Sequence, residues 1–205
     1  MKTERIFNVP NLMILPEQVE LESLQQPYFL YVGRINPIKA LDKLIKGLAM
    51  SCTFIQSDYI LKIAGATDGQ YYHELLELIR QHNLENKVEF LGVLTGTKLS
   101  QLYAGAKWLF LVSESENFGN VVIEALCQST PVVASKGAPW QCLESSGAGY
   151  WIDNTPSSIE KIVTKIISLD TKEYLAKRKM AHDLSLTFDV YSNMGEWVRV
   201  LDSWN

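Results

Sequence analysis

Short, unbroken apolar runs recur along the chain and predict a parallel sheet. The first run, residues 28–33, reads YFLYVG. Such a run does not alternate apolar with polar residues. It therefore suits a strand in a sheet that helices cover on both faces. Six such runs predict six strands, at residues 28–33, 59–65, 88–92, 108–113, 131–135 and 150–152.

Amphipathic stretches separate these runs and predict helices. Residues 69–83 carry apolar side chains at i, i+3, i+4 and i+7, the stripe with which a helix packs on a sheet. Residues 157–169 show a similar stripe, and Ser157 and Glu160 have capping-box spacing at its start. From about Thr171 onward the pattern predicts only helix. Alternating strands and helices predict an α/β fold, a single Rossmann-like, doubly wound six-stranded parallel sheet with helices on both faces.

Composition fits a globular domain and argues against several classes of function. The 205 residues are 47% hydrophobic, and a formal net charge of −4 gives no basic footprint for nucleic acid. Three cysteines without a CxxC pair indicate neither a disulfide framework nor a zinc site. We expect a cytoplasmic protein with reduced thiols, because neither a signal-peptide core nor a run of about 18 apolar residues occurs.

The loop after the first strand, GRINPIKALDKLI, is the first candidate for chemistry. Gly33 allows a ligand to approach the backbone closely, and ligands of such sheets bind beyond the carboxyl ends of the strands. Arg34 and Lys39 flank Pro37, and two cations across a proline-set turn can converge on a phosphate or diphosphate. Taken alone, the pair fits a solvated basic turn better.

The second candidate is the segment SESENFGNVVIEAL, residues 113–126. If a helix begins near Gly119, the amides around it form an anion site at the positive end of the helix. Glu116 precedes that helix and Glu124 lies in its second turn, and carboxylates there suit the hydroxyl groups of a sugar. The alternative makes Glu116 a favourable charge at the helix start and Glu124 a solvated residue. The apolar neighbours of Glu124 argue against that alternative.

The third loop, residues 135–151, contains a turn at Gly137 and Pro139. Trp140 follows, and it could form a pocket wall or part of the core. We favour the core.

Together these motifs resemble the nucleotide-sugar-binding half of retaining glycosyltransferases of the GT-B fold, glycosyltransferase family 4 or "group 1". The resemblance rests on Arg34-x4-Lys39 after an apolar strand, on the KVEFLG strand, and on Glu116-x7-Glu124 within ESENFGNVVIEALCQSTPVVAS. The segment GAPWQCLESSGAGYWID is similar to a variant in which Pro-Trp follows the fifth strand. The resemblance runs from about Phe7 to Trp204.

The resemblance implies a role for each matching residue. Arg34 and Lys39 would hold the donor diphosphate and neutralise the leaving group, Glu116 would contact the donor sugar, and Glu124 would bind the ribose. Arg34, Lys39 and Glu116 are therefore the expected catalytic residues, with no metal ligand and no cofactor. The base would lie against the backbone of the third strand. The expected donor-binding set is Gly33, Arg34, Lys39, Phe90, Leu91, Glu116, Asn117, Phe118, Gly119, Asn120 and Glu124.

Four positions depart from the family pattern. Asn117, Ala40 and Ser129 stand where glycine is usual, and Lys107 replaces a common aspartate. Asparagine tolerates a left-handed conformation, so we expect the turn at Asn117 to survive.

The resemblance also implies a domain organisation. FNVPNLM resembles the start of the family's second half. We therefore expect residues 1–26 to end an interdomain linker, 27–186 to form the nucleotide-sugar-binding domain, and 187–205 to form a helix that would cross to a missing amino-terminal half. An apolar stripe of Trp197, Val200, Leu201 and Trp204 could then drive self-association.

The expected function is donor binding in a retaining, metal-independent glycosyltransferase of cell-surface polysaccharide or glycoconjugate synthesis. The isolated domain would bind nucleotide but turn over poorly. Its partners would be the nucleotide-sugar donor, a saccharide or lipid-linked saccharide acceptor, and the missing amino-terminal half. Any peripheral association with a membrane would occur only through that missing half. Alternatives are a non-catalytic nucleotide-sugar-binding subunit and a GT-B-fold epimerase or phosphorylase. No lysine here has the context of a pyridoxal-phosphate site, which a phosphorylase needs.

Overall fold

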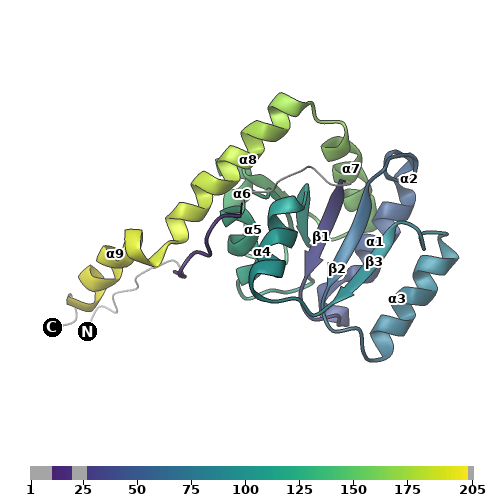
Figure 1. Cartoon of the computed structure of the whole chain (residues 1–205), viewed down its shortest axis with the longest axis horizontal. Helices are drawn as coiled ribbons and strands as arrows, with labels where there is room; N and C mark the ends of the chain where they lie inside the picture. Colours follow the sequence, from purple (N-terminus) through teal and green to yellow (C-terminus); the bar gives the residue numbers. More distant parts are fainter. Residues whose placement is uncertain (1–10, 20–26, 203–205) are drawn as a thin grey trace, which may run out of the picture.

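The computed structural model of the protein describes residues 11–19 and 27–202, except the side chains of Glu196, Val200, Leu201 and Asp202. The six predicted strands are confirmed and form one sheet in which all paired strands run parallel, in the order β3-β2-β1-β4-β5-β6. Figure 1 labels the first three of them, β1, β2 and β3. The strands are β1 Tyr28–Val32, β2 Ile60–Ala64, β3 Val88–Gly92, β4 Trp108–Leu111, β5 Val132–Ser135 and β6 Gly149–Ile152.

Helices cover both faces of this sheet, as predicted. Buried side chains of α1, α2, α3 and α7 pack on one face, and those of α4, α5, α6 and α8 pack on the other. The helices are α1 Leu41–Met50, α2 Cys52–Gln56, α3 Gln70–Gln81, α4 Gly96–Gly105, α5 Asn120–Cys127, α6 Cys142–Ser146, α7 Pro156–Ile167, α8 Thr171–Ser185 and α9 Val190–Asp202, with 3-10 turns η1 Pro37–Lys39 and η2 Leu186–Phe188.

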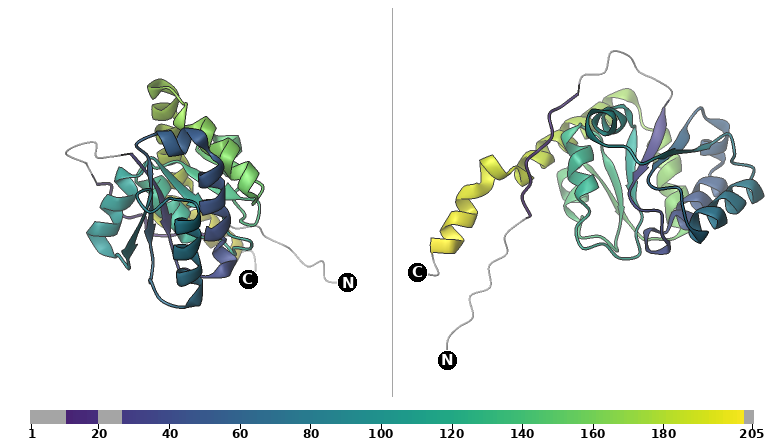
Figure 2. Two further views of the ribbon diagram at one scale, coloured as in Figure 1. Left: turned by 90° about the vertical axis from the view of Figure 1, so that its right-hand side faces the viewer. Right: turned by 60° about the horizontal axis from the view of Figure 1, so that its bottom comes forward.

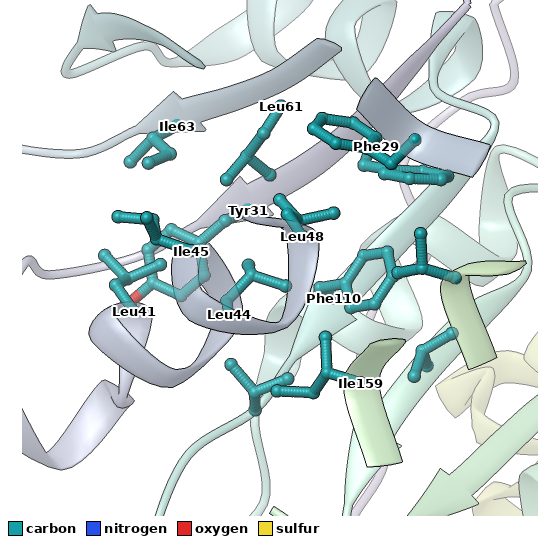
Figure 3. Close-up of a cluster of buried hydrophobic side chains, with 14 of the residues drawn as sticks. Phe29, Tyr31, Leu41, Leu44, Ile45, Leu48, Leu61, Ile63, Phe110 and Ile159 are labelled. Carbon is teal, nitrogen blue, oxygen red and sulfur yellow. The ribbon is translucent and has the colours of Figure 1, made fainter. Parts of the chain in front are cut away.

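The strands are apolar on both sides because each side has its own core. In β1, Phe29 and Tyr31 point into the α1 and α7 core, whereas Leu30 points into the core of the opposite face. Successive side chains of a strand point to opposite faces of the sheet, and here the residues on both faces are apolar. Figure 3 shows α1 wedged between the sheet and α7, with Leu44 and Ile159 among the buried side chains.

The expected capping box at Ser157 and Glu160 is wrong. The N-cap of α7 is Thr155, whose side chain accepts a hydrogen bond from the Ser158 amide, and Pro156 occupies the first helical turn. Proline is favoured there because its missing N–H would have no helical partner. A capping box does occur at the start of α8, between Asp170 and Glu173.

The end of the described chain leads away from the sheet. In Figures 1 and 2, α8 runs past the sheet edge and α9 projects beyond it. Helix α9 exposes apolar side chains, including Trp197, which is 39% exposed. The side chains of Val200, Leu201 and Trp204, expected in the same stripe, lie outside the described residues.

Part of the leading segment packs beside the root of α9. The Met13 amide donates to the Phe188 carbonyl at 3.0 Å, and the Val190 amide donates to the Met13 carbonyl at 3.1 Å. The remainder of the expected segment, residues 1–10 and 20–26, lies outside the described residues. In the described chain, no helix has both the length and the apolar character needed to cross a bilayer.

Candidate functional site

A pocket lies at the carboxyl edge of the sheet, where β1 and β4 are neighbours. Strand order reverses at this pair, because β2 and β3 continue on one side and β5 and β6 on the other. The loops that follow β1 and β4 diverge there and leave a crevice, which is the ligand position of doubly wound folds. The pocket has a volume of about 380 Å³, within the roughly 300–1,000 Å³ of small-molecule sites. Its lining comprises Tyr31, Val32, Gly33, Arg34, Lys39, Leu111, Glu116, Asn117, Phe118, Gly119, Asn120 and Val121.

The loop after β1 is held from inside the core. The Tyr31 hydroxyl, on a buried side chain, donates to the Arg34 carbonyl at 2.8 Å. Gly33 has a φ of 150°, and a Cβ added there would lie 3.0 Å from the Tyr31 oxygen, so glycine suits this close approach. Arg34 itself is exposed, and its guanidinium forms no ion pair with the part of the chain that the structure describes. A cation at the pocket therefore remains available to a ligand.

Lys39 and Glu116 join the two loops across the pocket. The ammonium of Lys39 forms a hydrogen-bonded ion pair with Glu116 Oε2, and the two side chains are 15% and 16% exposed. Lys39 reaches this position because it ends the 3-10 turn η1, which begins at Pro37. The sequence predicted two cations converging on an anion; in the structure one of them is occupied by a carboxylate of the protein.

Helix α5 presents an open amino terminus to the same pocket. Gly119 is its N-cap, with a φ of 84° and no side-chain capping bond, and Asn120 is its first residue. The predicted helix start near Gly119 is thus confirmed. Glycine suits this turn chiefly because of its left-handed backbone, and a Cβ there would also lie 2.9 Å from Leu111 Cδ2. The free amides and the helix dipole favour an anion here.

Asn117 does not adopt the left-handed conformation that asparagine tolerates, although the expected turn before α5 does form. Among the described non-glycine residues, positive φ occurs at Ala40, Asn83 and Ser129, with φ of 51°, 55° and 60°. The turn before α5 instead places its positive φ on Gly119, so Asn117 needs no special conformation. Ala40 and Ser129, where the resemblance implies that glycine is usual, do adopt the left-handed backbone.

Glu124 lies outside the pocket lining and has a structural partner. Its Oε2 accepts a hydrogen bond of 2.7 Å from the hydroxyl of Tyr103, a buried residue of α4. Burial, and secondarily the charge of Glu124, raise the pKa of Tyr103, which keeps the phenol neutral and able to donate. Glu124 is itself half-buried, so it is not the fully solvated residue of the alternative interpretation.

The two expected base-binding residues also lie outside the lining. Phe90 and Leu91 are half-buried at the end of β3, and the Phe90 ring meets Tyr72 edge-on with centroids 5.0 Å apart. Eight of the eleven expected donor-binding residues therefore line one cavity, and Phe90, Leu91 and Glu124 do not.

Sequence reasoning missed several residues that shape the pocket. Tyr31, Val32, Leu111 and Val121 line it, but in the sequence they are ordinary apolar residues of strands and a helix. The prediction that Trp140 belongs to the core is confirmed, since it is 1% exposed, yet its indole N–H also donates to the Phe118 carbonyl. No pattern in the sequence indicates that contact.

Metal-ligating residues are not gathered at this site. Across residues 11–19 and 27–202, no group of three or more His, Cys, Asp and Glu side chains could hold a metal ion. The departure at Lys107 lies away from the pocket: its amide donates to Tyr28, which begins β1, and its ammonium lies 4.6 Å from the Tyr174 ring centroid.

Comparison with known proteins extends these observations. The family model described as "Glycosyl transferases group 1" matches residues 17–185. An uncharacterized glycosyltransferase of Methanocaldococcus jannaschii is 34% identical over 141 residues, which are 68% of this chain and 35% of the relative. The sulfoquinovosyl transferase SQD2 of Arabidopsis thaliana is 31% identical over 159 residues, 75% of this chain and 29% of the relative.

A solved structure agrees with the fold. Anabaena HepE, crystallised in complex with UDP-glucose, superposes with a TM-score of 0.72 at 25% identity. That match covers 86% of this chain and 48% of the HepE chain. The chain thus spans less than half the length of each of these three proteins.

Proposed function

This chain belongs to the glycosyl transferases group 1 family, and from that premise we propose that its described domain binds a nucleoside diphosphate sugar and supplies the donor half of a glycosyl transfer. One observation carries the proposal. The exposed cation of Arg34, the ammonium of Lys39 and the uncapped start of α5 all border the pocket between β1 and β4.

The charges of this pocket suit a diphosphate. A diphosphate needs cations and N–H groups, and Arg34, Lys39 and the amides at Gly119 and Asn120 provide both. Glu116 carries a negative charge that would repel the phosphates. Its ion pair with Lys39 partly neutralises that charge and so weakens the repulsion. A carboxylate held at the rim can then accept hydrogen bonds from sugar hydroxyls.

We propose a retaining reaction without a metal ion. The bond from the sugar carbon to the diphosphate oxygen breaks, and the acceptor oxygen bonds to the same carbon on the same face. The acceptor proton leaves with the diphosphate. Arg34, Lys39 and the α5 amides would stabilise the charge that develops on the departing group, so fixed electrostatics would carry the step. Arg34, Lys39 and Glu116 are the proposed catalytic residues.

The outlying residues fit the remainder of a nucleotide. Glu124 would bind the ribose with the carboxylate oxygen that Tyr103 leaves free, and Tyr103 would fix its rotamer. The backbone of Phe90 and Leu91 at the end of β3 would line the base site.

The length of the matched proteins suggests that the active enzyme contains a further domain. Each of the three matched proteins is more than twice as long as the matched region, so we propose that turnover needs a second domain that binds the acceptor. We further propose a cytoplasmic setting and a role in polysaccharide or glycoconjugate synthesis. HepE binds UDP-glucose, which makes UDP the first nucleotide to test.

A ligand panel tests this function. UDP, GDP and ADP, each beside its parent nucleoside, are titrated while the thermal unfolding midpoint is recorded. The proposal expects one diphosphate to raise the midpoint more than the other two do, and every nucleoside to act weakly, because ligands of the native state stabilise it by mass action. Equal, small effects of all six compounds would contradict it. Release of UDP from a UDP-sugar by the isolated chain should stay near the background rate.

A further inference from the structure

Trp140 lies behind the pocket and holds its anion-binding turn. The residue follows β5, is 1% exposed and does not line the cavity. Its indole N–H donates to the carbonyl oxygen of Phe118, the residue before the N-cap of α5. The two rings also touch, with centroids 5.0 Å apart at an angle of 41°. A buried tryptophan usually finds a partner for its N–H, but here the partner belongs to the pocket wall.

The bonded carbonyl shares a peptide plane with the N–H of Gly119, the N-cap of α5. The Phe118 carbonyl and the Gly119 N–H belong to one trans peptide, and its planarity makes the two groups point in opposite directions. Fixing the oxygen toward buried Trp140 therefore aims the N–H away from the core. Within the described chain, the backbone hydrogen bonds include no acceptor for that N–H.

Without the indole bond, the plane of the Phe118–Gly119 peptide could change its orientation. Gly119 has a φ of 84°, in a region that glycine shares with its mirror conformations, so the residue alone does not fix the plane. Hydrogen bonds that point at an anion contribute fully only when they are already oriented. The indole supplies that orientation.

A third ring completes the support. Phe188, in η2, packs on Trp140 with centroids 5.3 Å apart and on Phe118 with centroids 6.1 Å apart. Its carbonyl accepts the hydrogen bond from Met13. The indole is thus fixed between the pocket turn and the root of α9.

We propose that Trp140 is a positioning residue for the donor nucleotide: it orients the Phe118–Gly119 peptide so that the Gly119 N–H meets the distal phosphate, and Phe188 keeps the indole in place. This inference rests on the proposed function. Trp140 acts through the backbone and touches no reacting atom.

The test compares two tryptophans that make the same kind of bond. Trp140→Phe retains a ring and removes the N–H. Trp151→Phe is the matched control, because the Trp151 indole donates to a backbone carbonyl too, that of Ala138, at 2.8 Å. UDP and uridine are titrated into both variants and the parent chain by calorimetry. The ratio of the two affinities isolates the phosphate contribution.

Trp140→Phe should lower the UDP affinity roughly tenfold, as expected for a hydrogen bond to a charged group, and leave uridine unchanged. Trp151→Phe should change neither. Phe188→Leu should give a smaller loss confined to UDP. Equal losses for UDP and uridine, or equal losses in the two tryptophan variants, would mean that Trp140 only packs and would overturn the proposal.

A second measurement covers the case in which Trp140→Phe does not fold. In the ¹⁵N-labelled parent chain, the assigned indole N–H resonance of Trp140 should shift with UDP and not with uridine, while that of Trp151 stays in place. A resonance that ignores saturating UDP would overturn the positioning role alone. A parent chain that binds no UDP, GDP or ADP would overturn the proposed function, and this role with it.

Discussion

The Lys39 ammonium and the Glu116 carboxylate form an ion pair that spans the mouth between the two pocket loops. Both side chains are largely buried, so solvent screens the pair less than it screens a surface pair. The cation that would bind a diphosphate is therefore partly neutralised until a ligand arrives.

Glu116→Gln should strengthen binding of UDP without its sugar. The amide keeps the shape of the side chain but frees the positive charge of Lys39, which is expected to contribute about 1 kcal/mol, or roughly fivefold in affinity. The same change should remove any preference for a UDP-sugar over UDP, because the sugar hydroxyls lose a charged acceptor. Calorimetry with both ligands measures the two effects.

Glu114→Gln provides the control for that experiment. Glu114 is on the same loop and pairs with Lys43 at 2.5 Å, but it does not line the pocket. Weaker UDP binding by Glu116→Gln, or an equal gain in both variants, would show that the ion pair does not restrain Lys39.

Ser129→Gly should stabilise the fold by up to about 1 kcal/mol, reduced by loss of the exposed hydrogen bond that Ser129 Oγ accepts from Gln18 Nε2 at 3.3 Å. Ser129 has a φ of 60° just beyond α5, and the bonds Ser129 N–H to Leu126 and Thr130 N–H to Ala125 form a Schellman motif. A side chain in this left-handed position costs about 1 kcal/mol, which glycine avoids. Urea unfolding measures the gain.

The end of α3 offers a matched comparison. Asn83, with a φ of 55°, closes the same motif through bonds to Arg80 and, from Leu84, to Ile79. Asparagine tolerates this conformation better than serine, so Asn83→Gly should stabilise less than Ser129→Gly. The reverse order would contradict the strain account. Ala40→Gly should gain little, because relief of its backbone is offset by loss of a buried methyl group.

Tyr103→Phe should make the protein less sensitive to alkali. Burial and Glu124 raise the pKa of Tyr103 above its ordinary value of 10.0, so the folded state holds this proton more tightly than the unfolded state does. Its contribution to stability is complete below pH 10 and is lost as the pH rises above 10, by about 1.4 kcal/mol per pH unit for one proton. Urea midpoints from pH 9 to about 11 should therefore fall less steeply in the variant.

Tyr191→Phe is the control for this titration. Tyr191 is 73% exposed on α9, so this change removes a tyrosine hydroxyl without touching the core. Identical slopes in the parent chain and in Tyr103→Phe would show that folding does not make Tyr103 bind its proton more tightly.

The apolar side chains of α9 should cause self-association. Tyr191, Met194, Trp197 and Val198 are 73%, 52%, 39% and 47% exposed on this projecting helix. Four exposed apolar side chains within eight residues can form the kind of apolar patch that marks an interaction surface. Sedimentation velocity should detect larger species as the concentration rises, and Trp197→Ser should shift the equilibrium toward the monomer. A single monomeric species at every concentration would refute the expectation.

The sheet could be predicted because its strands carry a strong local signal. Runs such as that of β4 are apolar on both faces, and only a strand between two helical layers needs this. The spacing of Ser157 and Glu160 does not mark the start of α7, because Thr155 and Pro156 begin the helix two residues earlier.

The candidate site was predictable where charge and glycine mark it. Arg34, Lys39, Glu116 and Gly119 all line the cavity. The contacts that orient these groups join residues far apart in the chain, such as the bond from Trp140 to Phe118. A short sequence motif cannot predict such contacts, because they form only when folding brings the loops after β4 and β5 together.

Nucleotide binding at this pocket is tested by calorimetric titration of UDP, GDP and ADP into the parent chain, Arg34→Ala and Arg80→Ala. Arg34 is the exposed cation of the pocket, whereas Arg80 pairs with Glu77 at 3.2 Å on the surface of α3. One nucleoside diphosphate should bind. Arg34→Ala should weaken its binding roughly tenfold or more, as for loss of a charged hydrogen bond, and Arg80→Ala should leave it unchanged. Absence of binding for all three nucleotides, or full affinity in Arg34→Ala, would contradict the proposed function.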